Sequence, residues 1–215
     1  MKKSNILGSV AAFIEAAAYV HGIIFFAVIM KYNEAFSNSD KLALLIENQS
    51  MMLTAYFVIY LLFGIALVFL SVSLYKALKR NGSELATTVY SFGIIWSTVV
   101  IATGMINNIS IGYLVKLFEI NPGQAETVFA TLRLITEGLG GGNEIVGGIF
   151  TLLVSLANHK VKIFSTTVTY NGFLVGIAGI VSTFPQAAEI ATSVFGLGQI
   201  FWFVFVGIGF LKLDK

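Results

Sequence analysis

Ionisable side chains are rare within the long apolar stretches of this chain, and Glu15 is the first that could do chemistry there. It interrupts the apolar run Ile6–Met30. In a helix that begins at Ile6, Glu15 lies roughly 14 Å along the axis, near the middle of a bilayer core about 30 Å thick. A carboxyl at that depth is typical of a proton carrier or a cation ligand. A neutral Glu that hydrogen-bonds to a neighbouring helix is the alternative.

Two further groups in this run bear on the same chemistry. Tyr19 follows Glu15 at i+4 and therefore shares its helix face. His21 lies further along, off that face, and an imidazole titrates in the physiological range. A single His on a helix is also compatible with ordinary packing, so His21 has a functional and a structural interpretation.

The segment from Thr136 to Glu144 is the most unusual local sequence. Four glycines in five positions lie between the acids Glu137 and Glu144, next to Asn143. Glycines weaken a helix by up to about 1 kcal/mol each, which favours a discontinuous helix whose exposed backbone lines a polar cavity. The alternative is an outer loop that ends with Asn143 as an N-cap and Glu144 in the first turn of a helix.

Other polar groups are expected at the same membrane depth. Asn107 and Asn108 lie near the outer end of an apolar stretch that starts at Leu85, and Glu189 lies near the start of the last one. Together these groups predict an outward-facing polar vestibule that narrows toward a buried Glu15. The predicted ligand- or proton-binding residues are Glu15, His21, Asn107, Asn108, Glu137, Asn143 and Glu144.

The elements that must position these groups are membrane helices. Of the 215 residues, 57% are hydrophobic and only 11% are charged, and the mean hydropathy is +0.87. Soluble domains carry about 25% charged residues, so lipid must cover this apolar surface. We therefore predict an all-α polytopic membrane protein: one domain (1–215), a bundle of six transmembrane helices with a short helical outer cap. The expected spans are 6–30, 51–75, 85–107, 135–158, 162–184 and 188–211.

The cap is expected in two outer segments. Residues 34–50 place Ala43, Leu44 and Leu45 between charges, which predicts a short helix on the membrane surface. After a turn at 121–123, Gln124 to Glu137 carries an apolar stripe with helical spacing.

Basic residues set the predicted orientation. Nine of the thirteen Lys and Arg residues fall on the side of the two termini and four on the other side. The positive-inside rule then places both termini in the cytoplasm of a plasma (inner) membrane. The start of the chain resembles a signal peptide, but the apolar run continues well past a signal-peptide core, so we expect an uncleaved first helix.

Several chemistries are excluded by what the sequence lacks. It has no Cys, which rules out disulfides and thiolate metal sites. Its two histidines, His21 and His159, lie at opposite membrane faces and cannot form a zinc or haem site together. It has no phosphate-binding loop, dinucleotide fingerprint or nucleophile elbow, and no basic cluster interleaved with aromatics. We expect no cofactor, no metal and no nucleic-acid partner.

The C-terminal half also carries a family resemblance. Gly147-Gly148-Ile149-Phe150, Asn171-Gly172, Gly176-Ile177-Ala178-Gly179 and the run from Phe195 to Trp202 resemble an uncharacterised family of bacterial six-helix membrane proteins, known as a domain of unknown function. The resemblance implies an integral protein of the bacterial inner membrane. It supplies no activity and no site residues.

Three functions remain open at this point. The first is a transporter-like protein that binds a small molecule or cation. The second is a structural or accessory subunit that contacts a second copy or another membrane protein through glycine faces, such as the one at Gly176. The third, least favoured because no nucleophile or metal accompanies the acids, is an intramembrane enzyme using Glu137 and Glu144 on a lipid-like substrate.

Overall fold

The computed structural model describes residues 3–33, 35–139 and 144–213, and these residues fold as helices without any β-strand. The helical segments, of which η1 and η2 are π-helical, are α1 (Lys3–Ile23), η1 (Ile24–Ile29), α2 (Asn38–Glu47), α3 (Gln49–Tyr56), η2 (Phe57–Leu62), α4 (Phe63–Arg80), α5 (Ala86–Ile120), α6 (Pro122–Gly138), α7 (Glu144–Val161), α8 (Thr166–Val181) and α9 (Ala188–Lys212).

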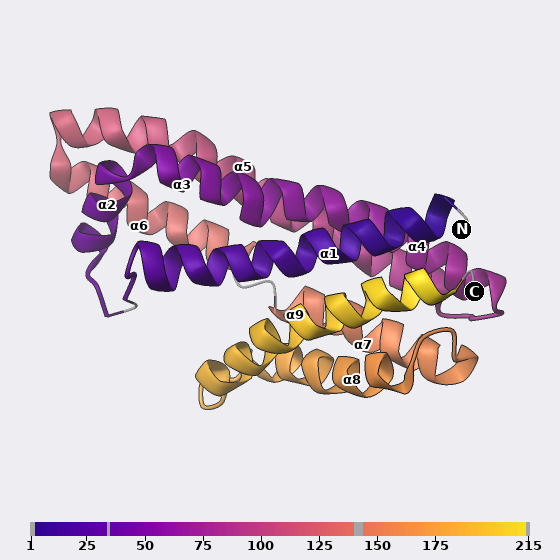
Figure 1. Ribbon diagram of the computed structural model, residues 1–215. Helices are drawn as coiled ribbons and strands as arrows, with labels where there is room; N and C mark the ends of the chain where they lie inside the picture. The colour runs from indigo at the N-terminus through magenta and orange to yellow at the C-terminus, as the bar shows by residue number, and fades with distance from the viewer. Residues whose placement is uncertain (1–2, 34, 140–143, 214–215) are drawn as a thin grey trace.

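The long helices form a closed ring of neighbours. α1 packs against α4 and α9, α4 against α5, α5 against α7, and α8 lies between α7 and α9. α1 begins and α9 ends at the same end of the bundle, here called the termini end (Figure 1). α2 and α6 lie toward the opposite end, here called the cap end, where α5 and α6 project beyond α8 and α9 (Figure 1).

Within the described residues, four helical segments are long and apolar enough to cross a membrane. They are Lys3–Ile29, Gln49–Arg80, Ala86–Ile120 and Ala188–Lys212. They correspond to the first, second, third and sixth predicted spans. The other two predicted spans are also helical, but they are shorter: α7 has 18 residues and α8 has 16.

The third and fourth predicted spans differ from the helices observed. α5 runs to Ile120 instead of ending near Asn107, because Ile111 and Leu114 in its extension are buried in a second apolar core with Phe129 of α6. Residues 135–138 belong to α6, and α7 begins only at Glu144. The predicted span 135–158 therefore joins parts of two helices.

Both predicted cap helices are present. Two reciprocal hydrogen bonds between Ser37 and Asp40 cap the start of α2. The Ser37 N–H donates to the Asp40 carboxylate, and the Asp40 N–H donates to the Ser37 hydroxyl oxygen. Asn121 caps α6 by accepting a 3.1 Å hydrogen bond from the Gln124 N–H, and Pro122 occupies the first helical position.

An aromatic cluster fills the centre of the ring. Trp96 of α5 lies 5.5 Å from Phe63 of α4, 5.6 Å from Phe150 of α7 and 6.2 Å from Phe203 of α9, measured between ring centroids. Tyr19 of α1 joins it at 5.6 Å from Phe63. Rings from α1, α4, α5, α7 and α9 thus interlock, which fixes these helices relative to one another.

The contact between α7 and α8 depends on glycine. A Cβ atom on Gly148 would lie 2.9 Å from the carbonyl oxygen of Gly176 and 3.0 Å from the Cα of Gly179. The two backbones therefore touch, as small residues allow in membrane helix pairs. The glycine face at Gly176 is used inside the chain.

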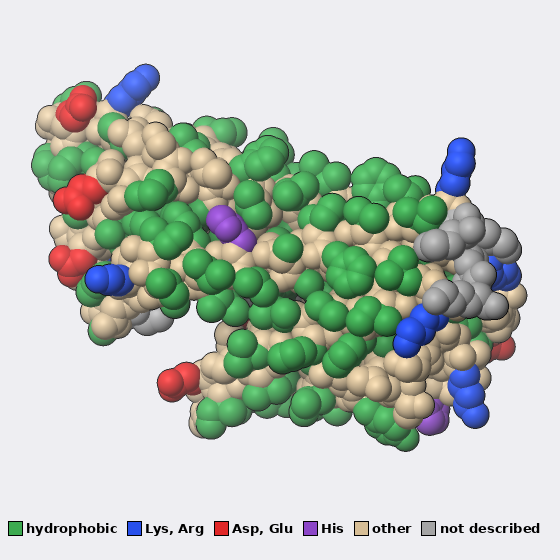
Figure 2. All heavy atoms as spheres, in the orientation of Figure 1, with side chains coloured by type: hydrophobic (Ala, Val, Ile, Leu, Met, Phe, Trp, Pro, Cys, Tyr) green, Lys and Arg blue, Asp and Glu red, His purple; other side chains and the backbone are tan. Residues whose placement is uncertain are grey.

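Hydrophobic, basic and acidic side chains occupy different regions of the surface. Hydrophobic side chains cover the length of the bundle, Lys and Arg gather at the termini end, and most Asp and Glu lie at the cap end (Figure 2). The same view shows a hollow between the projecting cap end and the start of α9 (Figure 2). An apolar length between two charged ends is the surface expected of a membrane protein.

Candidate ligand-binding cavity

A cavity of about 340 Å³ lies at the cap end, walled by η1, α2, α3, η2, α5 and α6. Its residues come from segments far apart in the sequence, and four of them, Leu45, Met52, Leu114 and Phe129, belong to the second apolar core described above. Pockets of about 300–1,000 Å³ with a mostly apolar wall and a few convergent polar groups are typical of small-molecule sites.

One wall is a chain of aromatic rings. Phe26 lies 5.9 Å from Tyr32 and 6.3 Å from Tyr56, and Tyr56 lies 5.8 Å from Tyr60. Phe26 belongs to η1 and Tyr60 to η2, so both π-helical segments meet this cavity. A π-helical turn carries an extra residue that redirects the side chains around it, and such turns are frequent at functional sites.

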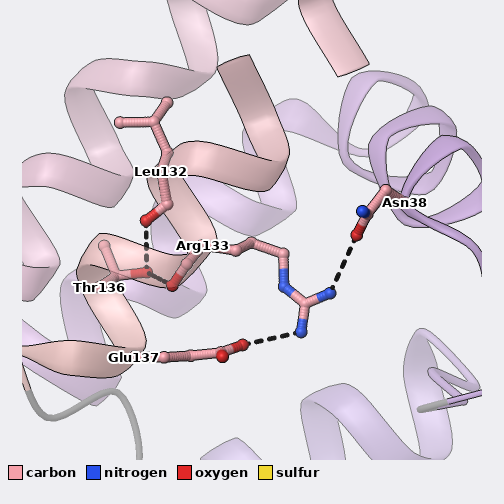
Figure 3. Close-up of polar contacts among 5 residues, drawn as sticks. All are labelled: Asn38, Leu132, Arg133, Thr136 and Glu137. Atoms are coloured by element: carbon pink, nitrogen blue, oxygen red, sulfur yellow. Dashed lines mark hydrogen bonds and ion pairs between the residues drawn. The ribbon is translucent and has the colours of Figure 1, made fainter. Parts of the chain in front are cut away.

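The cavity lining also carries polar groups, several of them on α6. Arg133 of α6 donates a 2.8 Å hydrogen bond to Glu137 one turn along the helix, and a longer one of 3.4 Å to Asn38 of α2 (Figure 3). Thr136 donates its hydroxyl to the carbonyl oxygens of Leu132 and Arg133, at 3.0 and 3.1 Å (Figure 3). The Thr136 oxygen therefore keeps its accepting lone pairs for a ligand.

Three further polar residues line the cavity. Ser110 donates its hydroxyl to the Asn107 carbonyl at 3.0 Å, and both residues line the cavity from α5. Lys41 of α2 holds its ammonium 5.2 Å from the centre of the Tyr32 ring, a cation–π distance. Two cations, an acid, an amide and two hydroxyls thus line the same space as a row of aromatic rings.

Of the residues predicted from sequence, Asn107 and Glu137 line this cavity together. Glu15 lies elsewhere, fully buried in the centre of the ring (0% exposed), and neither of its carboxyl oxygens hydrogen-bonds to a described residue. Glu144 is the first residue of α7 and is half-buried. Asn143 lies outside the described residues.

His21 and Asn108 are not part of the cavity wall. The His21 ring stacks on Phe25 at 6.1 Å, and its buried Nε2 has no partner among the described residues. The Asn108 Oδ1 is buried without a described partner as well. Asn108 follows Asn107 by one residue, about 100° around a helix of 3.6 residues per turn, so the two amides face different directions.

Four further lining residues were not predicted from the sequence as site residues: Tyr32, Tyr56, Tyr60 and Arg133. Two signals were present in the chain. Tyr56 and Tyr60 are spaced i,i+4 within an otherwise apolar stretch, and Arg133 is spaced i,i+4 from Glu137. Both spacings place polar groups on one helix face.

The described residues hold no group of three or more His, Asp or Glu side chains that could bind a metal ion. No protein-family model, no curated protein and no solved structure matches this chain. The resemblance of the C-terminal half to a six-helix bacterial family stays a prediction. The case for function therefore rests on the geometry of the cavity.

Proposed function

We propose that this protein spans a membrane six times and binds a small molecule or ion in the cap-end cavity, from the outer face, as a transporter or a binding protein. The observation that carries the proposal is the cavity itself. Aromatic rings and the polar side chains of Arg133, Glu137 and Asn107 line a space of about 340 Å³. At ~30 Å³ for each water molecule, this space corresponds to roughly ten waters, which suits a small metabolite.

Six spans require α7 and α8 to cross the membrane together with the four longer segments. With 18 residues, α7 extends about 27 Å, close to the thickness of a hydrocarbon core of about 30 Å. α8 is apolar and packs along α7 through glycine. An even number of spans agrees with the finding that α1 begins and α9 ends at the same end of the bundle (Figure 1).

The basic residues orient this bundle. Lys3, Arg80, Lys162 and Lys212 lie at the start of α1, the end of α4, the α7–α8 turn and the end of α9, all at the termini end. The positive-inside rule assigns that end to the cytoplasm. The cavity then opens on the outer side.

The wall of the cavity suggests the chemistry of its ligand. Rings of Phe26, Tyr56 and Tyr60 favour an apolar or aromatic body, since stacked rings bury large areas. The Arg133 guanidinium presents five N–H donors in a fork that suits a carboxylate or phosphate, and only some of them are used by Glu137 and Asn38. We therefore expect a small organic acid or a zwitterion.

A second candidate function is an accessory subunit of a membrane complex, and one observation favours it. An open apolar groove of about 590 Å³ runs between α5 and α6, where Ile109 is 73% exposed. A helix of another membrane protein would fit such a groove. The glycine face at Gly176 does not support this reading, because it already packs inside the chain.

Ligand-dependent thermal stability of the purified protein in detergent tests the first proposal. A panel of amino acids, carboxylic acids and amines is scanned with wild type, Arg133→Gln and Arg80→Gln. At 100 times the dissociation constant a bound compound stabilises the folded state by about 2.7 kcal/mol. We expect a compound that stabilises wild type and Arg80→Gln but not Arg133→Gln. Equal stabilisation of all three proteins would place binding elsewhere, and no stabilisation by any compound would favour the accessory subunit.

A further inference from the structure

The open apolar groove between α5 and α6 adjoins the cap-end cavity. Ser110 of α5 and Leu132 of α6 line both spaces. Each cavity residue of α5 directly follows a groove residue in the sequence: Asn107 follows Ile106, Ser110 follows Ile109, and Leu114 follows Tyr113. Since successive residues of a helix point about 100° apart, the cavity and the groove lie on neighbouring faces of the same helix.

In the proposed six-span arrangement, the groove crosses the boundary of the hydrocarbon core at the cap end, where α5 and α6 project beyond α8 and α9 (Figure 1). α5 begins at Ala86, shortly after the charged Glu84. At 1.5 Å per residue, Ala102 lies about 24 Å and Tyr113 about 40 Å along the helix, against a core of about 30 Å. The bilayer therefore supplies no hydrocarbon to the upper part of the groove, although Ile109 is 73% exposed there. An apolar occupant would cover this surface.

The two adjoining spaces differ in chemistry. Among the described residues that line the groove, none is charged, and only Ser110 and Tyr113 contribute a hydroxyl group. The cavity, in contrast, is lined by Arg133, Glu137 and Asn107 as well as by aromatic rings. A polar space and an apolar space that share two lining residues suit the two ends of one amphiphilic molecule. A helix of another membrane protein would cover the groove, but it would not need the groove to adjoin the cavity.

We propose that the ligand is an alkyl carboxylic acid, whose carboxylate lies in the cap-end cavity and whose tail lies in the α5–α6 groove. Arg133 already shares its charge with Glu137 at 2.8 Å. A singly charged carboxylate therefore suits it better than a phosphate group, which carries about two negative charges at pH 7. The tail leaves the cavity at Ser110, the smaller of the two shared side chains, and lies along Ile109 and Met105. This inference rests on the proposed function and names the ligand class of the same cavity.

Dissociation constants of unbranched alkanoates, from propionate to dodecanoate, test this ligand class with the purified protein in lipid nanodiscs. Each methylene group that is buried raises the affinity about fourfold, so binding to wild type should tighten with chain length until the groove is filled. Ile109→Gln should bind decanoate about tenfold more weakly than wild type, the contribution of about two methylene groups, and propionate equally well. Met105→Gln, one turn away on the same face of α5, should behave likewise.

The matched control is Ile190→Gln, because Ile190 is 75% exposed on α9 and does not line the groove. It should bind every alkanoate as wild type does. Each variant is compared with wild type for the same alkanoate, so partition of that alkanoate into the lipid affects both proteins alike. Arg133→Gln should weaken the binding of all chain lengths by the same factor, because they share one carboxylate.

The outcomes separate the tail site from the cavity. Alkanoates that bind wild type equally at every chain length would overturn the tail site, as would equal losses of decanoate binding in Ile109→Gln and Ile190→Gln. Neither result would count against a ligand in the cavity. Absence of binding by every alkanoate would overturn this ligand class. Arg133→Gln without effect at any chain length, while Ile109→Gln still weakens decanoate binding, would count against the proposed cavity itself.

Discussion

Arg133 and Glu137 form a 2.8 Å ion pair one helical turn apart on α6, at the wall of the cap-end cavity. Their side chains are 28% and 56% exposed. Pairs of this kind contribute only about 0.3–0.5 kcal/mol to stability. The pair therefore matters little for folding, and its place in the wall points to a role in recognition.

We predict that Arg133→Gln weakens ligand binding while leaving the stability of the protein nearly unchanged. We expect the free energy of unfolding to fall by less than about 1 kcal/mol, since an exposed i,i+4 pair is lost. Affinity for an anionic ligand should fall about tenfold or more, because a hydrogen bond to a charged group is worth about 1.5–3 kcal/mol. Titration calorimetry with the stabilising compound and thermal unfolding measure the two effects, with Arg80→Gln as control. A large stability loss with unchanged affinity would assign the pair to folding.

Because α7 and α8 touch through glycines, we predict that two Gly→Ala substitutions differ clearly in their effect on the stability of the protein. Gly148→Ala places a methyl group 2.9 Å from a backbone oxygen of α8, so the helices must separate, and overpacking of this kind costs about 1–3 kcal/mol.

Gly196→Ala of α9 is the matched control, because its added methyl meets no atom of the described residues within 4 Å. Alanine is also the better helix former by up to about 1 kcal/mol, so this variant should be as stable as wild type or more so. Thermal unfolding of both proteins in one detergent compares them. Equal losses would contradict close packing at Gly148.

The side-chain hydrogen bonds of Asn158 are expected to stabilise the turn between α7 and α8. Its side chain is buried, accepts a 2.8 Å hydrogen bond from the Phe164 N–H and donates one of 2.8 Å to the Thr169 hydroxyl. Asn158→Ala leaves a buried N–H without its partner and should cost about 2–3 kcal/mol. Thr169→Val removes one bond only and should cost about 1 kcal/mol. Additive losses in the double variant would show that the two side chains do not interact.

The hydrogen bonds at the start of α2 predict that the stability of this helix depends on pH. Hydrogen bonds from the Ser37 hydroxyl and backbone N–H lower the pKa of Asp40. A lowered pKa in the folded state stabilises α2 fully above the ordinary value of about 3.9, and that contribution disappears as the pH falls through the lowered pKa. Hydrogen-exchange protection of the α2 amides should therefore decrease below about pH 4 in wild type. Asp40→Asn should show no such decrease; an equal decrease in both proteins would rule out Asp40 as its source.

Much of the fold can be predicted from hydropathy and turn signals. The apolar run interrupted by Glu15 predicts the first helix, and the turn at 121–123 predicts a helix from Gln124, two residues after the observed start of α6 at Pro122. The predicted span 135–158 crosses the boundary between α6 and α7, whereas the alternative interpretation, a helix with Glu144 in its first turn, matches the observed start of α7. Hydropathy also cannot tell whether α7 and α8, which bury one face against each other, reach across the bilayer.

The candidate site was predictable only in part. Asn107 and Glu137 stand out as polar residues at the right depth, and both line the cavity. The tyrosines do not stand out, because Tyr is common at membrane interfaces. Their joint placement depends on two π-helical segments that redirect Phe26 and Tyr60 toward one space, and no spacing rule in the sequence signals a π-helical turn.

The central claim is that a polar cavity opens on the outer side, and cysteine labelling tests it most directly because the chain contains no Cys. Asn107→Cys lies in the cavity wall, and Lys162→Cys lies at the termini end. We predict that a membrane-impermeant thiol reagent labels Asn107→Cys in intact cells, that a bound ligand blocks this labelling, and that Lys162→Cys reacts only after permeabilisation. Labelling of Lys162→Cys in intact cells, with Asn107→Cys protected, would contradict the account.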